Sequence, residues 1–307
     1  MPVPAARVLP WLWGAAYLLL TLTAVFWAGN AVVGRGAREL IPPVSLSFWR
    51  WAIAFCLILP LAAPHLRRDL PALVRAWPDI LVLGALGIGA FNTLLYTGLQ
   101  TTTALNSILL QSAQPGFVLL FGLLIFRDQV SWREVLGAMV ALAGALVIVS
   151  AGELGMLLRL RLNLGDALIT VAVVLWALYS VLLRRRPAVH PLSFLAATVG
   201  VGVCCVAPFY AAELLAGEQI TPAPESWLAI AYVAVFPSVL AYLFFNRAVE
   251  LVGSAAVGQY LNIMPVVGAV LAMVFLGERL QLYHLAGAAL IGAGIVLATF
   301  RVRRPAP

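Results

Sequence analysis

The hydrophobic pattern of this 307-residue chain runs through once and then starts again near position 150. Residues at the same place in the two copies are 146 to 150 positions apart. The clearest matching pairs are Pro115 and Pro265, Asp128 and Glu278, Gly137 and Gly287, Gly144 and Gly294, Trp27 and Trp176, and Ser47 and Ser193. A duplication on this scale restricts the fold to an architecture built from two similar halves.

The composition places both halves in a membrane. Hydrophobic residues make up 63% of the chain and charged residues 10%, and the mean hydropathy is +1.02, all far from the values of soluble domains. A helix needs about 20 apolar residues to cross a bilayer, and the pattern predicts ten such spans. The predicted spans are Trp13–Gly34, Val44–Ala63, Pro78–Leu99, Ala104–Phe126, Val135–Ala151, Leu164–Leu183, Pro191–Leu214, Ser226–Val249, Ala255–Leu276 and Leu282–Phe300.

Ten spans divide into two repeats of five, residues 12–151 and 164–301, so the sequence predicts an all-α polytopic membrane protein. All 19 basic residues are arginines: 13 fall in connections on the side of the N-terminus, five fall on the opposite side, and Arg50 lies inside a span. The positive-inside rule therefore predicts that both termini are cytoplasmic, as in a protein of the bacterial inner membrane. Because five is odd, the second repeat is expected to be inverted relative to the first.

Catalytic, metal and cofactor chemistry are not indicated. Cys56, Cys204 and Cys205 lie in apolar spans, and the three histidines are scattered near span ends without metal-ligand spacing. The glycine-rich stretch Gly84–Gly89 lies inside a span with no preceding strand, so helix packing explains it better than phosphate binding. The net charge of +7 follows the membrane topology, so no nucleic-acid partner is expected. The paired glycines of the fifth and tenth spans predict closely packed helices.

Polar groups inside membrane spans are costly, so they face a cavity or another helix. At 3.6 residues per turn, the polar and aromatic side chains of the first, third, fourth, sixth, eighth and ninth spans each gather on one face. Spans two, five, seven and ten are more apolar and suit a lipid-facing periphery, and Arg50 is expected to snorkel to the surface or take a structural partner. The expected substrate site between the halves is Trp27, Asn30, Asn92, Tyr96, Gln111, Trp176, Tyr179, Tyr242 and Gln259.

Each amide of this set can equally serve an interhelical hydrogen bond. Proline frees backbone groups inside a helix, so Pro115, Gly116 and Pro265 are the expected hinges of the fourth and ninth spans. All 12 acidic residues fall in connections or near span ends, whereas proton-driven carriers keep a titratable group in the interior. This favours facilitated diffusion, unless Asp79 or Asp166 lies a turn deeper than predicted.

Several stretches carry a resemblance to a known family: Phe26-Trp27-Ala28-Gly29-Asn30, Phe48-Trp49-Arg50-Trp51, and Pro265 followed by Gly277-Glu278. With the paired five-helix halves, they resemble the EamA domains of the drug/metabolite transporter (DMT) superfamily over almost the whole chain. The resemblance implies ten helices, a cavity lined by helices 1, 3, 4, 6, 8 and 9, and export of small metabolites. The first copy departs from the Gly-Glu motif, reading Phe126-Arg127-Asp128. The aromatic interior is most similar to YddG-type exporters of aromatic amino acids.

The expected lining independently narrows the substrate. The chain has no lysine, and no arginine is expected on the cavity faces, which argues against phosphorylated substrates. Aromatic rings and amides suit neutral amino acids, above all aromatic ones. The lipid bilayer is the other expected partner of the protein, and no cofactor is expected. Cationic drugs exported by proton antiport are the alternative, because ring faces attract cations. An intramembrane enzyme or a scaffold protein stays open, and the sequence, compatible with a monomer, does not fix the oligomeric state.

Overall fold

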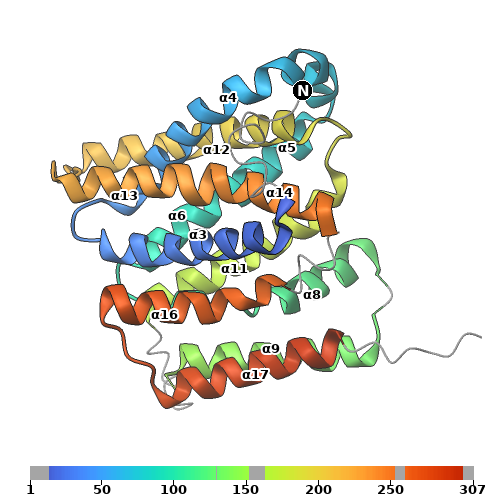
Figure 1. Ribbon diagram of the computed structural model, residues 1–307, viewed down its shortest axis with the longest axis vertical. Helices are drawn as coiled ribbons and strands as arrows, with labels where there is room; N and C mark the ends of the chain where they lie inside the picture. Colours follow the sequence, from blue (N-terminus) through green and yellow to red (C-terminus); the bar gives the residue numbers. More distant parts are fainter. Residues whose placement is uncertain (1–13, 129, 152–162, 253–259, 300–307) are drawn as a thin grey trace, which may run out of the picture.

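The computed structural model describes residues 14–128, 130–151, 163–252 and 260–299, and these ranges are helical, with no strand among them (Figure 1). The first half contains α3 (Ala16–Gly36), α4 (Pro43–Arg75), α5 (Trp77–Leu83), the π-helical η1 (Gly84–Ala90), α6 (Phe91–Gly98), α7 (Ala104–Gln111), α8 (Gln114–Phe126) and α9 (Trp132–Val149). The second half contains α11 (Leu164–Leu182), the 3₁₀ turn η2 (Leu183–Arg185), α12 (Pro191–Leu215), α13 (Pro224–Val235), the π-helical η3 (Phe236–Leu240), α14 (Ala241–Val252), the 3₁₀ turn η4 (Leu261–Ile263), α16 (Met264–Leu276) and α17 (Leu282–Thr299).

Seven helical segments of the described residues are long and apolar enough to cross a membrane, and Met264–Leu276 and Leu282–Leu297 are shorter apolar helices. The predicted all-helical membrane class is confirmed, while the count of ten spans stays a prediction. The second span was predicted to end at Ala63, but α4 continues to Arg75. Its prolines do not end the helix, because the extension packs on the second half, with Leu73 buried.

Helices α4 and α12 are antiparallel, and each begins at a carboxylate near the far end of the other (Figure 1). The Val44 amide donates to Glu213 at 3.1 Å, and the Ser45 amide and hydroxyl donate to the same carboxylate at 2.6 and 2.7 Å. In the other direction, the His190 amide donates to Asp69 at 2.9 Å. Val44 and His190 are 146 positions apart, the repeat offset. The two carboxylates therefore satisfy the free amides at equivalent helix starts.

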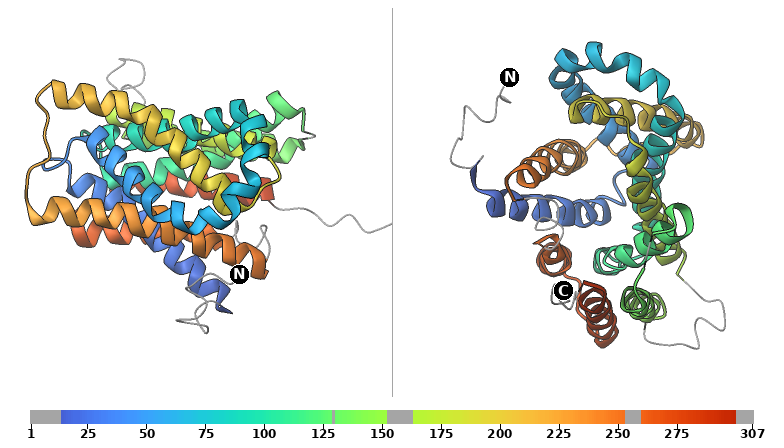
Figure 2. Two further views of the ribbon diagram at one scale, coloured as in Figure 1. Left: turned by 90° about the horizontal axis from the view of Figure 1, so that it is seen from above. Right: turned by 90° about the vertical axis from the view of Figure 1, so that its right-hand side faces the viewer.

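Helices α9 and α17 lie side by side along one edge of the bundle (Figures 1 and 2). A Cβ atom added to Gly144 would lie 2.6 Å from the carbonyl oxygen of Gly287, and one added to Gly294 would collide with the carbonyl oxygen of Gly137. Only glycine allows this approach, so the predicted close contact is confirmed. Gly144 thus contacts Gly287, the repeat equivalent of Gly137, and Gly137 contacts Gly294, the repeat equivalent of Gly144. Helices related by a two-fold axis make such reciprocal contacts.

The third and eighth predicted spans each contain a π-helical turn. Segment Trp77–Gly98 is interrupted by η1, and segment Pro224–Val252 by η3. A π turn inserts one residue into the helix and redirects the side chains around it, and such turns gather at functional sites. Asn92 is the second residue after the end of η1, and Ser238 lies within η3.

The fourth and ninth predicted spans are also interrupted, each just before its proline. Helix α7 ends at Gln111 and α8 starts at Gln114, with Pro115 in the first turn. The 3₁₀ turn η4 precedes α16, with Pro265 in the first turn. Proline fits a first turn because its missing N–H would have no partner there. Whether these breaks act as hinges stays a prediction.

Helices α8 and α16 both end at a residue in the left-handed conformation. That residue is glycine in the Gly-Glu motif of the second half and arginine at the equivalent place in the first half. The φ angle is 64° at Gly277 and 55° at Arg127. Glu278 then accepts from the amides of Ala104 and Leu105, both at 2.8 Å, at the start of α7. Its counterpart Asp128 instead forms a two-pronged ion pair with Arg184, at 2.8 and 2.7 Å. This hydrogen bond to Arg184 lowers the pKa of Asp128 below its usual value.

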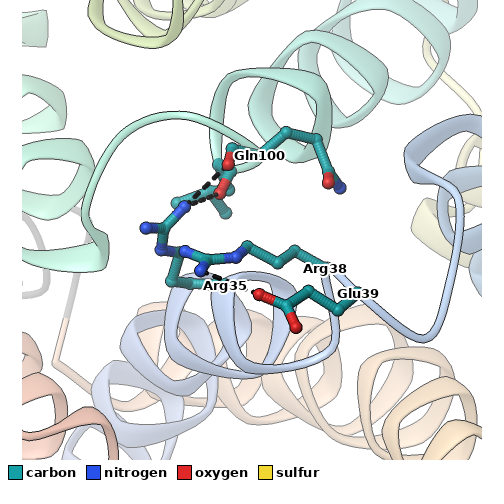
Figure 3. A network of polar contacts seen from close by, with 5 residues as sticks. Arg35, Arg38, Glu39 and Gln100 are labelled. Atoms are coloured by element: carbon teal, nitrogen blue, oxygen red, sulfur yellow. Dashed lines mark hydrogen bonds and ion pairs between the residues drawn. The ribbon is translucent and has the colours of Figure 1, made fainter.

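At the end of the bundle where α3 and α6 finish, arginine side chains satisfy backbone and carboxylate oxygens (Figure 3). Arg35 Nη1 donates to the carbonyl oxygens of Leu99 and Gln100 at 2.7 and 2.9 Å. Arg38 pairs with the exposed Glu39 at 3.0 Å. Arg35 therefore binds carbonyls that follow the last turn of α6, where a cation is favoured by the helix dipole.

Candidate functional site

A cavity of about 570 Å³ lies between the two halves. Its wall is formed by residues of α3, α4, α6, α7 and α8 from the first half and of α11, α14, α16 and α17 from the second. This volume is within the range of small-molecule sites. The lining is largely apolar, with a few amides, two hydroxyls and one cation among the described residues.

Most of the predicted site residues meet at this cavity. Its wall includes Trp27, Asn30, Asn92, Gln111, Trp176 and Tyr242, together with the two prolines Pro115 and Pro265. Tyr96 and Tyr179 are buried behind the wall and do not line it, and Gly116 packs against Ala138 of α9. Gln259 lies outside the described residues.

Two aromatic pairs belong to the wall, and each contains the tryptophan of one half's first helix. Trp27 of α3 packs edge-on against Tyr242, with ring centroids 5.8 Å apart and an interplanar angle of 74°. Its indole Nε1 donates to the carbonyl oxygen of Pro237 at 3.1 Å, a group of the π turn η3. Trp176 of α11 contacts Phe91, with centroids 4.6 Å apart. Phe91 was not predicted, because a phenylalanine in an apolar span carries no signal that separates cavity from core.

Arg50 is the cation of the cavity wall, and its guanidinium joins three elements of the first half to η3 of the second. Its Nε donates to Ser238 Oγ at 2.6 Å. Its Nη1 donates to Asn30 Oδ1 at 2.9 Å, to Asn92 Oδ1 at 2.6 Å and to the Tyr96 hydroxyl at 2.9 Å. The Tyr96 hydroxyl donates in turn to Asn30 Oδ1 at 2.6 Å. Two predicted site amides and one predicted tyrosine therefore position an arginine.

This geometry decides between the two outcomes expected for Arg50 and corrects a further expectation. Arg50 takes structural partners and does not snorkel to the surface: it is only 4% exposed, about 10 Å along α4 at 1.5 Å per residue. A cation at the centre of a membrane helix costs about 2.5–3.5 kcal/mol on insertion scales, and the four neutral acceptors offset that cost. The expectation that no arginine faces the cavity was therefore wrong. It failed because the residues around Arg50 come from other helices.

The expected lipid-facing periphery needs a further correction. The second predicted span supplies Arg50 to the wall, and the tenth supplies Ala288, Ile291, Gly292 and Ile295 from α17. An apolar helix can line a cavity as readily as it faces lipid, because both surroundings accept apolar side chains. The lining therefore extends beyond helices 1, 3, 4, 6, 8 and 9.

A second buried polar cluster lies at the start of α11, outside the cavity wall. Asp166, 3% exposed, accepts hydrogen bonds from the hydroxyl of Thr102 and from Asn106 Nδ2, the latter at 3.2 and 3.3 Å. Asn106 Oδ1 lies 2.8 Å from His284 Nε2, and the Gln281 amide donates to His284 Nδ1 at 2.9 Å. Because Nδ1 accepts, Nε2 carries the proton and donates to Asn106. The carboxylate of Asp166, which was expected near a span end, is thus connected through Asn106 to His284 of α17.

In the part of the chain that the structure describes, no group of three histidine, cysteine, aspartate or glutamate side chains could hold a metal ion. The cavity wall contains amides, aromatic rings, the hydroxyls of Ser112 and Tyr242, and Arg50. These groups offer hydrogen bonds, ring faces and one positive charge, and no base among these lining residues activates a nucleophile.

Comparisons with known proteins agree with this arrangement. The model of the EamA-like transporter family matches residues 14–150 and 163–300, once on each half. The chain is 28% identical over 300 residues to "Uncharacterized transporter YyaM" of Bacillus subtilis, covering 94% of this chain and 95% of that protein. It is also 28% identical to the "Probable amino-acid metabolite efflux pump" of Salmonella typhimurium (94% and 96% covered) and to the "Probable terminal-alkyne amino-acid exporter" of Streptantibioticus cattleyicolor (92% of each).

A crystal structure of a protein shares the fold. Its TM-score with this chain is 0.61 at 20% sequence identity, over 93% of this chain and 96% of that one. At this identity the likeness concerns the fold alone.

Proposed function

Because this chain belongs to the EamA-like transporter family, whose members are membrane transporters and not enzymes, we propose that it exports small neutral metabolites across the bacterial inner membrane. The proposed substrates are amino acids with aromatic or hydrophobic side chains. One observation carries the proposal: the cavity between the halves, about 570 Å³, has aromatic rings and amides in its wall. The printed names of two relatives, an amino-acid metabolite efflux pump and an amino-acid exporter, support this substrate class.

The proposed mechanism is alternating access between two inverted repeats, residues 12–151 and 164–301. Reciprocal contacts between equivalent helices support it. Each of α4 and α12 begins near the end of the other, and the glycines of α9 pack against the equivalent glycines of α17. Such contacts arise when two copies are related by a two-fold axis in the membrane plane. With arginines concentrated on one side, both termini are proposed to be cytoplasmic. A single chain encloses the cavity, so a monomer suffices for this mechanism.

The test of the site is flux in proteoliposomes loaded with a panel of amino acids. Replacing Trp27 or Trp176 with alanine should lower the flux of phenylalanine about 2- to 30-fold, since a cation–π contact between the ammonium group and a ring face contributes about 0.5–2 kcal/mol. Trp132→Ala is the matched control, because Trp132 is 68% exposed on α9 and is not part of the wall. Full flux in both cavity variants over a concentration series would show that the substrate binds elsewhere.

Proton antiport of cationic drugs is the second candidate. The buried Asp166, hydrogen-bonded through Asn106 to His284, favours it, because both end groups can bind a proton. The described cavity wall contains no carboxylate or histidine, however, so a cation bound there would not be coupled to a group of that kind. We therefore propose facilitated diffusion down the gradient of the substrate. An imposed pH gradient should drive no uphill accumulation of phenylalanine in proteoliposomes, and accumulation that collapses with a protonophore would replace this mechanism by antiport.

A further inference from the structure

We propose that Arg50 is the carboxylate-binding residue of the cavity, so that a transported molecule must carry one carboxylate group. The inference rests on the proposed export of small metabolites and narrows it. It separates zwitterionic amino acids and aryl carboxylic acids, which would bind, from amines and cationic drugs of the same shape, which would not.

The hydrogen bonds of Arg50 leave one nitrogen of the guanidinium available. An arginine has five N–H donors. Nε is used by Ser238, and Nη1 by Asn30, Asn92 and Tyr96. Within the described residues, Nη2 has no acceptor, and Arg50 belongs to the cavity wall. The side chain is thus held by its neighbours while one of its donor groups stays open for a ligand.

The charge around Arg50 is not balanced by the protein. Its four hydrogen-bond partners are two amide oxygens and two hydroxyls, all neutral, and the rings of Trp51 and Tyr96, 4.6 and 6.0 Å from the guanidinium carbon, carry no net charge either. No carboxylate in the part of the chain that the structure describes lies within 4 Å of it, since the ion pairs there involve Arg38, Arg184 and Arg247. A cation in a low-dielectric cavity attracts an anion far more strongly than the same cation in water. The cavity therefore favours a negatively charged group beside Arg50.

The number of charges selects the kind of anion. The chain has no lysine, and Arg50 is the one basic residue of the described cavity wall. One guanidinium balances one carboxylate, with which it forms directional charge-assisted hydrogen bonds. A phosphate, with its higher charge, would need a second cation. Free cationic amines would meet the repulsion of Arg50 and have no carboxylate partner in this wall.

The aromatic side of the wall is one helical turn away. Asn30, which binds Arg50, is three residues beyond Trp27 on α3, a rise of about 4.5 Å. An aromatic amino acid could place its carboxylate at Arg50 and its ring at Trp27. The ammonium group would then face ring surfaces and amides, which tolerate it but do not require it.

Binding to the purified protein, followed by intrinsic tryptophan fluorescence and confirmed by equilibrium dialysis, tests this without transport. Three probes share one phenyl ring: L-phenylalanine, 3-phenylpropionate, which lacks the amine, and phenethylamine, which lacks the carboxylate. Phenylalanine and phenylpropionate should bind at least about tenfold more tightly than phenethylamine. This comparison needs only the unmodified protein. Equal or tighter binding of phenethylamine would overturn the proposal.

Variants add a second measurement. Arg50→Gln should lower the affinity for phenylpropionate at least about tenfold, with Arg133→Gln on α9 as the matched control that leaves it unchanged. If Arg50→Gln does not fold, Arg50→Lys keeps the charge but loses the fork and should weaken phenylpropionate while phenethylamine stays weak. A folded Arg50→Gln protein with full affinity for phenylpropionate would overturn the proposal. The proposal would also be overturned if neither chloride nor benzoate displaced bound phenylpropionate.

The outcomes also separate this inference from the proposed export. Binding of phenylpropionate that depends on Arg50, without flux of any amino acid, would support the carboxylate site and refute amino-acid export. Flux of phenylalanine with equal binding of phenethylamine would support export and overturn the carboxylate site.

Discussion

Replacing Asp166 with alanine is expected to cost about 3–6 kcal/mol of stability, because two buried hydrogen bonds to a charged group are lost at about 1.5–3 kcal/mol each. Thr102 and Asn106 both donate to this carboxylate. The Thr102 hydroxyl would stay buried without this acceptor, and Asn106 Nδ2 would keep only its long 3.4 Å hydrogen bond to Thr102 Oγ1. Asn106 would also lose the orientation in which it accepts from His284. The substitution therefore affects α7, α11 and α17 together.

Thermal unfolding of the purified protein in detergent measures this effect. Asp79→Ala is the matched control: Asp79 is also in the first turn of its helix, but it is half-buried and no side-chain hydrogen bond of the described structure involves it. Its loss should change the midpoint little, since a first-turn acid contributes about 0.3–1 kcal/mol through the helix dipole. If the two variants melt at the same temperature, the Asp166 network does not stabilise the fold.

Replacing both Pro115 and Pro265 with alanine is expected to slow transport at least about tenfold, equivalent to about 1.4 kcal/mol of activation free energy. Alanine is favoured over proline by about 3 kcal/mol in a helix interior. It would allow α7 to run on into α8, and η4 into α16, and would stabilise straight helices where the structure has breaks. Movement of one bundle against the other would then require breaking added backbone hydrogen bonds.

The measurement is the maximal rate of phenylalanine flux, with binding affinity determined separately. The matched control is Pro60→Ala with Pro208→Ala, a pair 148 positions apart inside the uninterrupted helices α4 and α12. This pair should leave the rate unchanged. A Pro115 and Pro265 double variant with an unaltered rate would show that the breaks do not act as hinges.

Much of the architecture follows from local properties of the sequence. The duplication, the helical class and the aromatic face of the first helix depend on hydropathy and on the 3.6-residue period, which each segment carries by itself. Trp27, Gln111 and Trp176 meet at one cavity because each lies on the polar face of its own helix. The close contact of α9 and α17 also follows from the sequence, since glycine has no side chain to keep the two helices apart.

The tertiary structure alone decided the role of Arg50. Its partners lie 20, 42, 46 and 188 positions away along the chain, on α3, α6 and η3. The period of α4 reports which residues share a face, but not which other helices meet that face or at what depth. Burial of a charge depends on these neighbours, because a cation is stable in a membrane only where enough acceptors converge on it. The sequence by itself determined two helical halves and an aromatic interior; only their packing determined that a cation stands in it.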